Sequence, residues 1–364
     1  MDKSSTATPD GFEDAQEAEG RRRLVYPFEH GPKTGEAIDV APGVKWMRMP
    51  LGGSLAFINV WAIAEDGGWA IADTGIGGAQ TVQAWRDAFK GPLGGKRATR
   101  VFATHMHPDH IGMAGWLTRK YSCRLWITRL EFLTCRSLAA DTGRPAPEDG
   151  IRFYRAAGWD EEQLETYRAR FGFFGKSLHA LPDSFHRLHD GDEVRIGDHM
   201  WRVVVGSGHS PEHGCFYCPD LKLLISGDQV LPKISSNVAV FPTEPDGDPL
   251  DEWLTSLARI KTLVPDDVLV LPAHNDPFHG LHARIDHLIA GHEEGLARLR
   301  ALLAEPKRVV DVFPALFRRP IDDNNLGLAT GESLAHLNYL LARGQAVRTR
   351  DEHGVDWYSA GATA

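Results

Sequence analysis

The chain has 364 residues, 42% of them hydrophobic, and its formal net charge at pH 7 is −9. This length allows two or three domains. The acidic balance argues against a general binder of nucleic acid or of an anionic membrane, which usually carries a basic face. No apolar run approaches the roughly 20 residues that a membrane-spanning helix needs.

The chain begins with a polar stretch, and we interpret residues 1–37 as a flexible tail. This stretch lacks the hydrophobic region of a secretory signal. The four cysteines are too few for a disulfide framework, so a reducing, cytoplasmic compartment is expected. Cys215 and Cys218 form a CxxC on a predicted strand. Because an odd spacing along a strand sends side chains to opposite faces, we predict two ordinary buried thiols.

Short strands are predicted over residues 44–75, separated by turn signals such as EDGG. Residues 81–91 have helical spacing and end in glycine. Residues 99–104 are typical of a strand, and residues 111–121 are typical of a helix. The six residues between these two elements therefore lie on a strand-to-helix loop, where functional groups usually sit.

Residues 129–186 interrupt the alternation of strands and helices, because they contain helical segments only. One of them offers Asp160 and Gln163 as a capping box. Leu164, Tyr167 and Phe171 then fall on one helix face. We interpret this region as an insertion that lies over another part of the molecule; an extra helical layer of ordinary core is the alternative.

Strands resume within residues 192–210, 215–228 and 267–275, and an amphipathic helix is predicted between the last two. This alternation favours a sheet-based α/β core. Beyond residue 281, one long helix, two shorter helices and a hairpin that turns at DEHG form a winged-helix pattern.

The loop after the strand at 99–104 carries His105, His107, Asp109 and His110 within six positions. Zinc and similar ions bind neutral imidazole and carboxylate oxygen. His105 and His107 can share one metal, and Asp109 and His110 can address a second. A surface loop that happens to be rich in histidine is the alternative, but so many ligand types directly after a strand disfavour it.

The H-x-H-x-D-H pattern of this loop resembles the signature of the metallo-β-lactamase superfamily. Four further motifs resemble those of the family and occur in its order: IADTG at 71–75, GSGHSPEH at 206–213, SGDQVL at 226–231 and LPAHN at 271–275. The resemblance implies an α/β fold, a four-layer αββα sandwich over residues 38–280. A helical insertion at about 129–186 and a C-terminal winged-helix-like domain over 281–364 complete the expected organisation.

The resemblance also implies two divalent metal ions. Zinc is the expected metal, with manganese or iron as alternatives. The implied ligands are His105, His107 and His209 for the first ion, Asp109, His110 and His274 for the second, and Asp228 as a bridge between them. Asp73 would support the ligand loop through hydrogen bonds, and His213 would lie behind the ligands. Glu212 departs from the family, which usually has glycine there, and adds a side chain near the rim of the site.

Such a site implies hydrolysis of an ester, thioester, lactone or amide by a hydroxide that both metals share. Asp109 would carry a proton to the leaving group. The ligand set resembles that of glyoxalase II, the acyl-homoserine lactonases and the lactamase-beta-2-like hydrolases, and the last group also has a C-terminal winged-helix-like domain. The true β-lactamases lack the bridging aspartate at the place of Asp228. A nuclease acting on RNA or single-stranded DNA is the alternative, which the net charge disfavours.

The insertion offers aromatic side chains for a substrate lid, with Tyr154, Tyr167 and Phe171 as the candidates. Aromatic rings among a few cations would suit a bulky acyl group on an acidic carrier, such as coenzyme A or glutathione. A solvated helix face is the alternative, because nearby acidic residues nearly cancel the charge. The expected partner is a small-molecule substrate, without nucleic acid or membrane, and a homodimer is possible.

Overall fold

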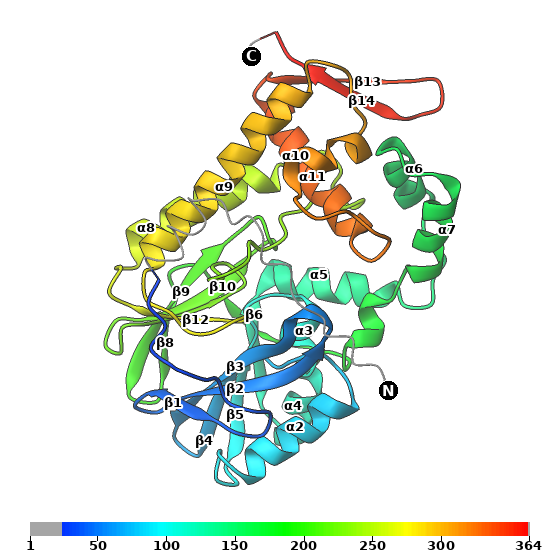
Figure 1. Cartoon of the computed structure of the whole chain (residues 1–364). Coiled ribbons are helices and arrows are strands. Elements are labelled where there is room, and N and C mark those ends of the chain that lie inside the picture. Colours follow the sequence, from blue (N-terminus) through cyan, green and yellow to red (C-terminus); the bar gives the residue numbers. More distant parts are fainter. Residues whose placement is uncertain (1–23, 363–364) are drawn as a thin grey trace, which may run out of the picture.

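The computed structural model describes residues 24–362, and two β-sheets form its centre (Figure 1). The strands of the first sheet are β1 (Ile38–Ala41), β2 (Val44–Gly52), β3 (Ala56–Glu65), β4 (Gly68–Ala72), β5 (Arg97–Phe102), β6 (Arg124–Thr128) and β7 (His186–Leu188), hydrogen-bonded in that order. The second sheet contains β8 (Glu193–Ile196), β9 (His199–Gly206), β10 (His213–Cys218), β11 (Leu223–Gly227) and β12 (Leu269–Pro272), in the order β12-β11-β10-β9-β8. Neighbours in the first sheet are antiparallel from β1 to β4 and parallel from β4 to β7.

Strand β3 shows why the first sheet is covered on both faces. Ile58 and Val60 belong to the hydrophobic cluster under the helices, whereas Trp61 and Ile63 belong to the cluster between the two sheets. Successive side chains of a strand point to opposite faces, so a strand that is apolar at nearly every position must be buried on both sides.

Helices complete the outer layers. Those against the first sheet are α2 (Ala79–Lys90) and α4 (Ala114–Tyr121), and those against the second are α8 (Pro249–Leu263) and α9 (Leu281–Leu302). Three hydrophobic clusters fill the spaces between four layers. The predicted αββα sandwich is therefore confirmed.

The insertion after β6 consists of α5 (Arg129–Ala140), α6 (Glu148–Ala156), α7 (Glu161–Arg170) and a 3-10 turn η2 (Phe174–Ser177), before the chain returns to the sheet at β7. The capping box at Asp160 is present: its side chain accepts from the backbone N of Gln163 at 2.9 Å, and Oε1 of Gln163 accepts from the backbone N of Asp160 at 3.0 Å. The sequence signal for the start of α7 is thus confirmed.

The C-terminal part contains η3 (Val309–Val312), α10 (Phe313–Leu316), α11 (Leu326–Ala342) and the antiparallel hairpin β13 (Ala346–Arg350) and β14 (Asp356–Ala360). One hydrophobic cluster joins Leu337 of α11 to Leu257 of α8 and Leu224 of β11. The C-terminal helices therefore share their core with the outer face of the second sheet.

Residues 1–23 of the predicted tail lie outside the described residues, but residues 24–28 lie against the core. Val25 forms an antiparallel bridge with His279, and Leu24 is buried. The ring of Phe28 packs edge-on against Trp46 at 5.7 Å. The prediction of a flexible tail is therefore wrong for this segment. Leu24 belongs to the cluster on the outer face of the second sheet, and Phe28 packs against the cluster between the two sheets. Within residues 24–362, no helix is both long and apolar enough to cross a membrane.

Candidate metal centre

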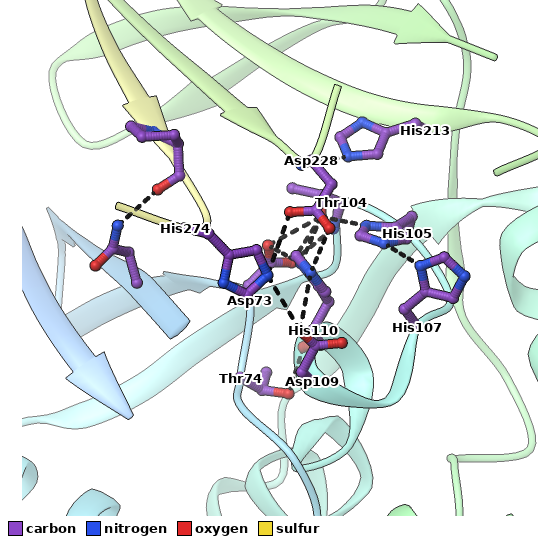
Figure 2. A network of polar contacts seen from close by, with 12 residues as sticks. Asp73, Thr74, Thr104, His105, His107, Asp109, His110, His213, Asp228 and His274 are labelled. Atoms are coloured by element: carbon purple, nitrogen blue, oxygen red, sulfur yellow. Dashed lines mark hydrogen bonds and ion pairs between the residues drawn. The ribbon is translucent and has the colours of Figure 1, made fainter. Parts of the chain in front are cut away.

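The structure brings all seven predicted ligands together at one edge of the two sheets. Figure 2 shows all of them except His209. They follow the carboxyl ends of strands: His105, His107, Asp109 and His110 come after β5, His209 after β9, Asp228 after β11 and His274 after β12. These strands run in the same direction within their sheets, so their ends lie side by side. Within the ligand loop, Asp109 and His110 lie on the short helix α3 (Pro108–Ile111), and the ring of His110 packs against that of His105 with the centroids 3.9 Å apart.

His105, His107 and His209 form the first group of ligand atoms. Nδ1 of His107 lies 2.8 Å from Nε2 of His105 and 3.0 Å from Nε2 of His209, and the two Nε2 atoms are 3.3 Å apart. Two nitrogen ligands of one tetrahedral zinc ion, each at about 2.0–2.1 Å from the metal, are about 3.3 Å apart. The triad therefore has the spacing of a metal site.

Asp109, His110 and His274 form the second group, and Asp228 lies between the two groups. Oδ2 of Asp109 is 3.3 Å from Nε2 of His274 and 3.6 Å from Nε2 of His110. Oδ2 of Asp228 lies 3.5 Å from Nε2 of His110 and also 3.5 Å from Nε2 of His209. A carboxylate in this place can reach metal ions held by either group.

Two buried atoms test whether a metal fits. Among the described residues, Nε2 of His110 and Oδ1 of Asp228 are buried without any hydrogen-bond partner. Buried polar atoms are nearly always paired, because burial without a partner costs free energy. Imidazole nitrogen and carboxylate oxygen are also the atoms that zinc and related ions prefer. The residues therefore fit a divalent cation.

The electrostatics differ between the two groups. Burial lowers the pKa of His105 well below its usual range, and burial together with His209 lowers the pKa of His107 to about 3. Both rings are therefore neutral, with a lone pair free to bind metal. Burial also lowers the pKa of His110, but Asp228 and Asp109 raise it by more, so that it lies well above its usual range. A metal ion that binds the second group must displace this proton.

Asp73 and His213 support the ligands from behind. Asp73, just after β4, accepts from the backbone N of Thr104 at 2.8 Å, and its Oδ2 lies 2.9 Å from Nδ1 of His110. Nε2 of His213 accepts from the backbone N of Asp228 at 3.1 Å. These contacts fix the orientation of one ligand ring and of the segment that carries Asp228.

Glu131, which the sequence did not single out, ties the two histidine-bearing loops together. Its side chain is buried, and it accepts from the backbone N of Met106 and from the backbone N of Glu212, each at 2.8 Å. Met106 lies between two ligands, and Glu212 belongs to the loop of His209. Burial raises the pKa of Glu131 against the opposing effect of Ser210 and these N–H groups. One glutamate thus holds the spacing of the first group.

Glu212, the departure from the family pattern, is anchored at the start of the insertion. Its Oε2 accepts from the backbone N of Leu130 at 2.8 Å, and its carbonyl accepts from Oγ1 of Thr128 at 2.7 Å. A carboxylate is favourable at a helix N-terminus, because the first N–H groups of a helix have no partner within it. Glu212 therefore fixes α5 to the loop of His209.

The three lid candidates pack against one another within the insertion. The ring of Tyr154 stacks on Trp159 at 4.2 Å and lies 4.7 Å from that of Tyr167, which in turn lies 5.9 Å from Phe171. Nε1 of Trp159 donates to Oγ1 of Thr330 in α11 at 2.9 Å. The aromatic face of the insertion therefore packs on the C-terminal helices, beside which α6 and α7 lie in Figure 1.

Comparisons with known proteins identify the family of both parts of the chain. The model of the metallo-beta-lactamase superfamily matches residues 53–274, and that of the metallo-beta-lactamase-like C-terminal domain matches residues 296–361. A solved beta-lactamase domain protein from Burkholderia ambifaria is 38% identical, with a TM-score of 0.87, and the match covers 94% of this chain and 100% of that one.

Two curated proteins are more distantly similar. The probable metallo-hydrolase YqgX of Bacillus subtilis is 25% identical over 64% of this chain and 90% of its own length. The hydroxyacylglutathione hydrolase of Maricaulis maris is 28% identical, over 26% of this chain and 34% of its own length.

Proposed function

The chain belongs to the metallo-β-lactamase superfamily, and from this premise we propose that it is a hydrolase of ester-type bonds that works with two divalent ions. The bond is a thioester, a lactone or a simple ester. The observation that carries the proposal is the place of Asp228, whose Oδ2 is equally distant from His110 of the second group and His209 of the first.

Bound divalent ions would lower the pKa of a water molecule and stabilise negative charge on a carbonyl oxygen. The chain's own residues supply the rest. The first group offers neutral imidazoles, and Asp73 holds one proton of His110 on Nδ1, so that Nε2 is the atom that binds once its own proton is displaced. The side chain of Asp109 is 20% exposed, against 11% for Asp228 and 0% for His110. We therefore assign the transfer of a proton to the leaving group to the carboxylate of Asp109.

The similarity to a hydroxyacylglutathione hydrolase supports the thioester among the three bond types. It covers only part of either chain, so a lactone and an aryl ester belong in the same test. The alternative is cleavage of RNA or single-stranded DNA, for which the acidic balance of the chain is unfavourable.

The test uses the full chain loaded with zinc, incubated with a thioester, a lactone, an aryl ester and a single-stranded RNA. We expect hydrolysis of at least one ester-type substrate, its loss on chelation and its return when zinc is restored. The Asp228→Asn variant, assayed beside it, should be inactive. Cleavage of the RNA without turnover of any ester-type substrate would replace this function by the alternative.

A further inference from the structure

A second feature of the molecule is a cavity of about 470 Å³ in the C-terminal part. It is bounded by α9, by the segment 316–321 that begins at the end of α10, by α11 and by the loop 233–237. Cavities of about 300–1,000 Å³ are the usual size for small-molecule sites. None of the seven predicted metal ligands lines it.

The cavity lies next to the metal centre, because the two share Asn237. This residue lines the cavity, and its backbone carbonyl accepts from Nδ1 of His209 at 2.7 Å. Its side-chain Nδ2 donates to Oε2 of Glu332, also in the cavity wall, at 2.7 Å. A molecule seated in the cavity would therefore lie within one residue of a ligand of the first group.

The wall of the cavity is positively charged. Among the residues that the structure describes, it contains the five cationic side chains Lys233, Arg284, Arg298, Arg318 and Arg319 and the two carboxylates Glu294 and Glu332. Burial raises the pKa of Glu332 to about 7, which reduces the negative charge of this group at neutral pH. The whole chain has a net charge of −9, so this concentration of positive charge runs against the overall balance. A concave, charged surface concentrates ions of the opposite sign.

Arg298 shows how one of these cations is positioned. Its Nε donates to the backbone carbonyl of Ala315 at 2.7 Å. A carbonyl fixes the guanidinium without cancelling its charge, so the remaining N–H groups can donate to an anion. Arginine is well suited to this task, because its planar group binds carboxylate and phosphate through paired hydrogen bonds.

We propose that this cavity binds the anionic carrier of the substrate, through carboxylate or phosphate groups, while the ester-type bond lies at the metal centre. The proposal rests on the proposed function and narrows it to acyl esters or thioesters of an acidic small molecule. The cavity is a compact pocket, whereas proteins that bind nucleic acid usually have an extended basic stripe. A small-molecule anion therefore fits the site better than a polynucleotide.

The test compares substrates that share an acyl group and differ in charge. The zinc-loaded protein is assayed with an acyl thioester of coenzyme A, which carries phosphates, with the same acyl thioester of glutathione, which carries carboxylates, and with that of the neutral N-acetylcysteamine. We expect kcat/KM to be at least tenfold higher for one of the charged thioesters than for the neutral one. Which charged thioester is preferred identifies phosphate or carboxylate as the bound group.

The double variant Arg298→Gln, Arg319→Gln removes two charges from the cavity, and Arg300→Gln is the matched control. Arg300 is an exposed residue of α9 that does not line the cavity. Its Nη1 donates to Oε1 of Gln345 at 3.2 Å. The ratio of kcat/KM between charged and neutral thioesters should fall at least tenfold in the double variant, and the control should keep the wild-type ratio. Equal ratios in all three proteins would overturn the proposal.

Binding separates this proposal from the proposed function. Calorimetric titration with free coenzyme A and free glutathione should show binding of one of them that salt weakens and that the double variant loses. This result would support the anion site even if no thioester were hydrolysed, in which case only the proposed function would fail. Absence of binding by both compounds, or tighter binding of a single-stranded oligonucleotide, would overturn the anion site as proposed.

Discussion

Oδ2 of Asp73 and Nδ1 of His110 lie 2.9 Å apart, and both side chains are buried. Asp73 adopts a left-handed backbone conformation with φ of 59° just after β4, an uncommon choice for a residue other than glycine. The contact holds one ring proton of His110 on Nδ1, so the proton that a metal ion must displace is on Nε2, which faces Asp228. The protonation state of His110 thus depends on Asp73, which does not belong to either group of ligands.

The first prediction concerns Asp73→Asn. The amide keeps the size of the side chain but loses its charge and one of its two acceptor oxygens, so the hold on His110 and Thr104 weakens. Changes of this kind typically cost about 10–100-fold in metal affinity. Competition with a chelator measures the affinity, and Asp183→Asn at an exposed site is the control. Wild-type affinity in Asp73→Asn would show that His110 does not need this partner.

The second prediction concerns Asp228→Asn. If Asp228 joins the two groups, its loss should release one of two metal ions and reduce turnover by more than the roughly 100-fold expected for a supporting residue. Elemental analysis measures the metal content and a steady-state assay measures the turnover, while far-ultraviolet circular dichroism checks that the variant is folded. Two retained ions with normal turnover would remove Asp228 from the metal site.

The third prediction concerns Glu131→Gln. The amide can accept at one oxygen only, so either Met106 or Glu212 loses its partner and faces an N–H group instead. An unsatisfied buried donor costs about 1–3 kcal/mol. We expect lower stability in chemical denaturation and weaker metal binding, whereas Glu293→Gln on the exposed side of α9 should change neither. Loss of stability with unchanged metal affinity would mean that Glu131 supports only the fold and not the metal site.

Several parts of the fold could be predicted because they depend on local patterns. The apolar run of β3 and the capping box at Asp160 are properties of a few neighbouring residues. Cys215 and Cys218 lie in different hydrophobic clusters on either side of β10, as their odd spacing predicts. The loop from His105 to His110 indicates a metal site by its own residues, whereas His209, Asp228 and His274 could be assigned only because their motifs resemble those of the family.

Other features depend on contacts between distant segments, and these could not be predicted. Glu131 is a single acid near the start of a helix, where acids are common for reasons unrelated to a metal site. Asn237 meets Glu332 only because α11 packs on the loop 233–237. The aromatic face of α7 was evident, but the surface that it covers was not.

The fourth prediction concerns that aromatic face. Tyr154 stacks on Trp159, which is hydrogen-bonded to α11, so Tyr154→Ala should leave a cavity between the insertion and the C-terminal helices. Removal of a buried ring costs about 3–5 kcal/mol, and less at a partly buried site. We expect lower stability and similar losses of activity on bulky and small esters. A selective rise of the Michaelis constant for bulky esters would instead place Tyr154 at the substrate.

The last prediction concerns pH and a pair of histidines in the cavity wall. Nδ1 of His292 in α9 lies 3.2 Å from Nε2 of His336 in α11, and both rings are buried. Burial, with a smaller effect of the facing ring, lowers the pKa of His292 to about 3, and burial together with Arg298 lowers the pKa of His336 to about 4. In the unfolded chain each ring has a pKa of about 6.5. Between about pH 4 and 6.5 the unfolded chain therefore binds protons that the folded protein excludes, and stability falls as the pH falls.

Glu332 acts in the opposite direction, because its pKa is raised to about 7 in the folded protein. Its stabilising contribution is lost as the pH rises from about 4.5 to 7, so the net slope of wild-type stability mixes both effects.

The variant His336→Gln isolates the contribution of one histidine to the pH dependence of stability. From pH 8 to pH 5 the wild type should lose about 2 kcal/mol more unfolding free energy than this variant, which is 1.5 pH units at about 1.36 kcal/mol each. Urea denaturation at both pH values measures the difference, with His353→Gln at an exposed hairpin position as the control. A difference that does not change with pH would mean that His336 takes up its proton in the folded protein as readily as in the unfolded chain.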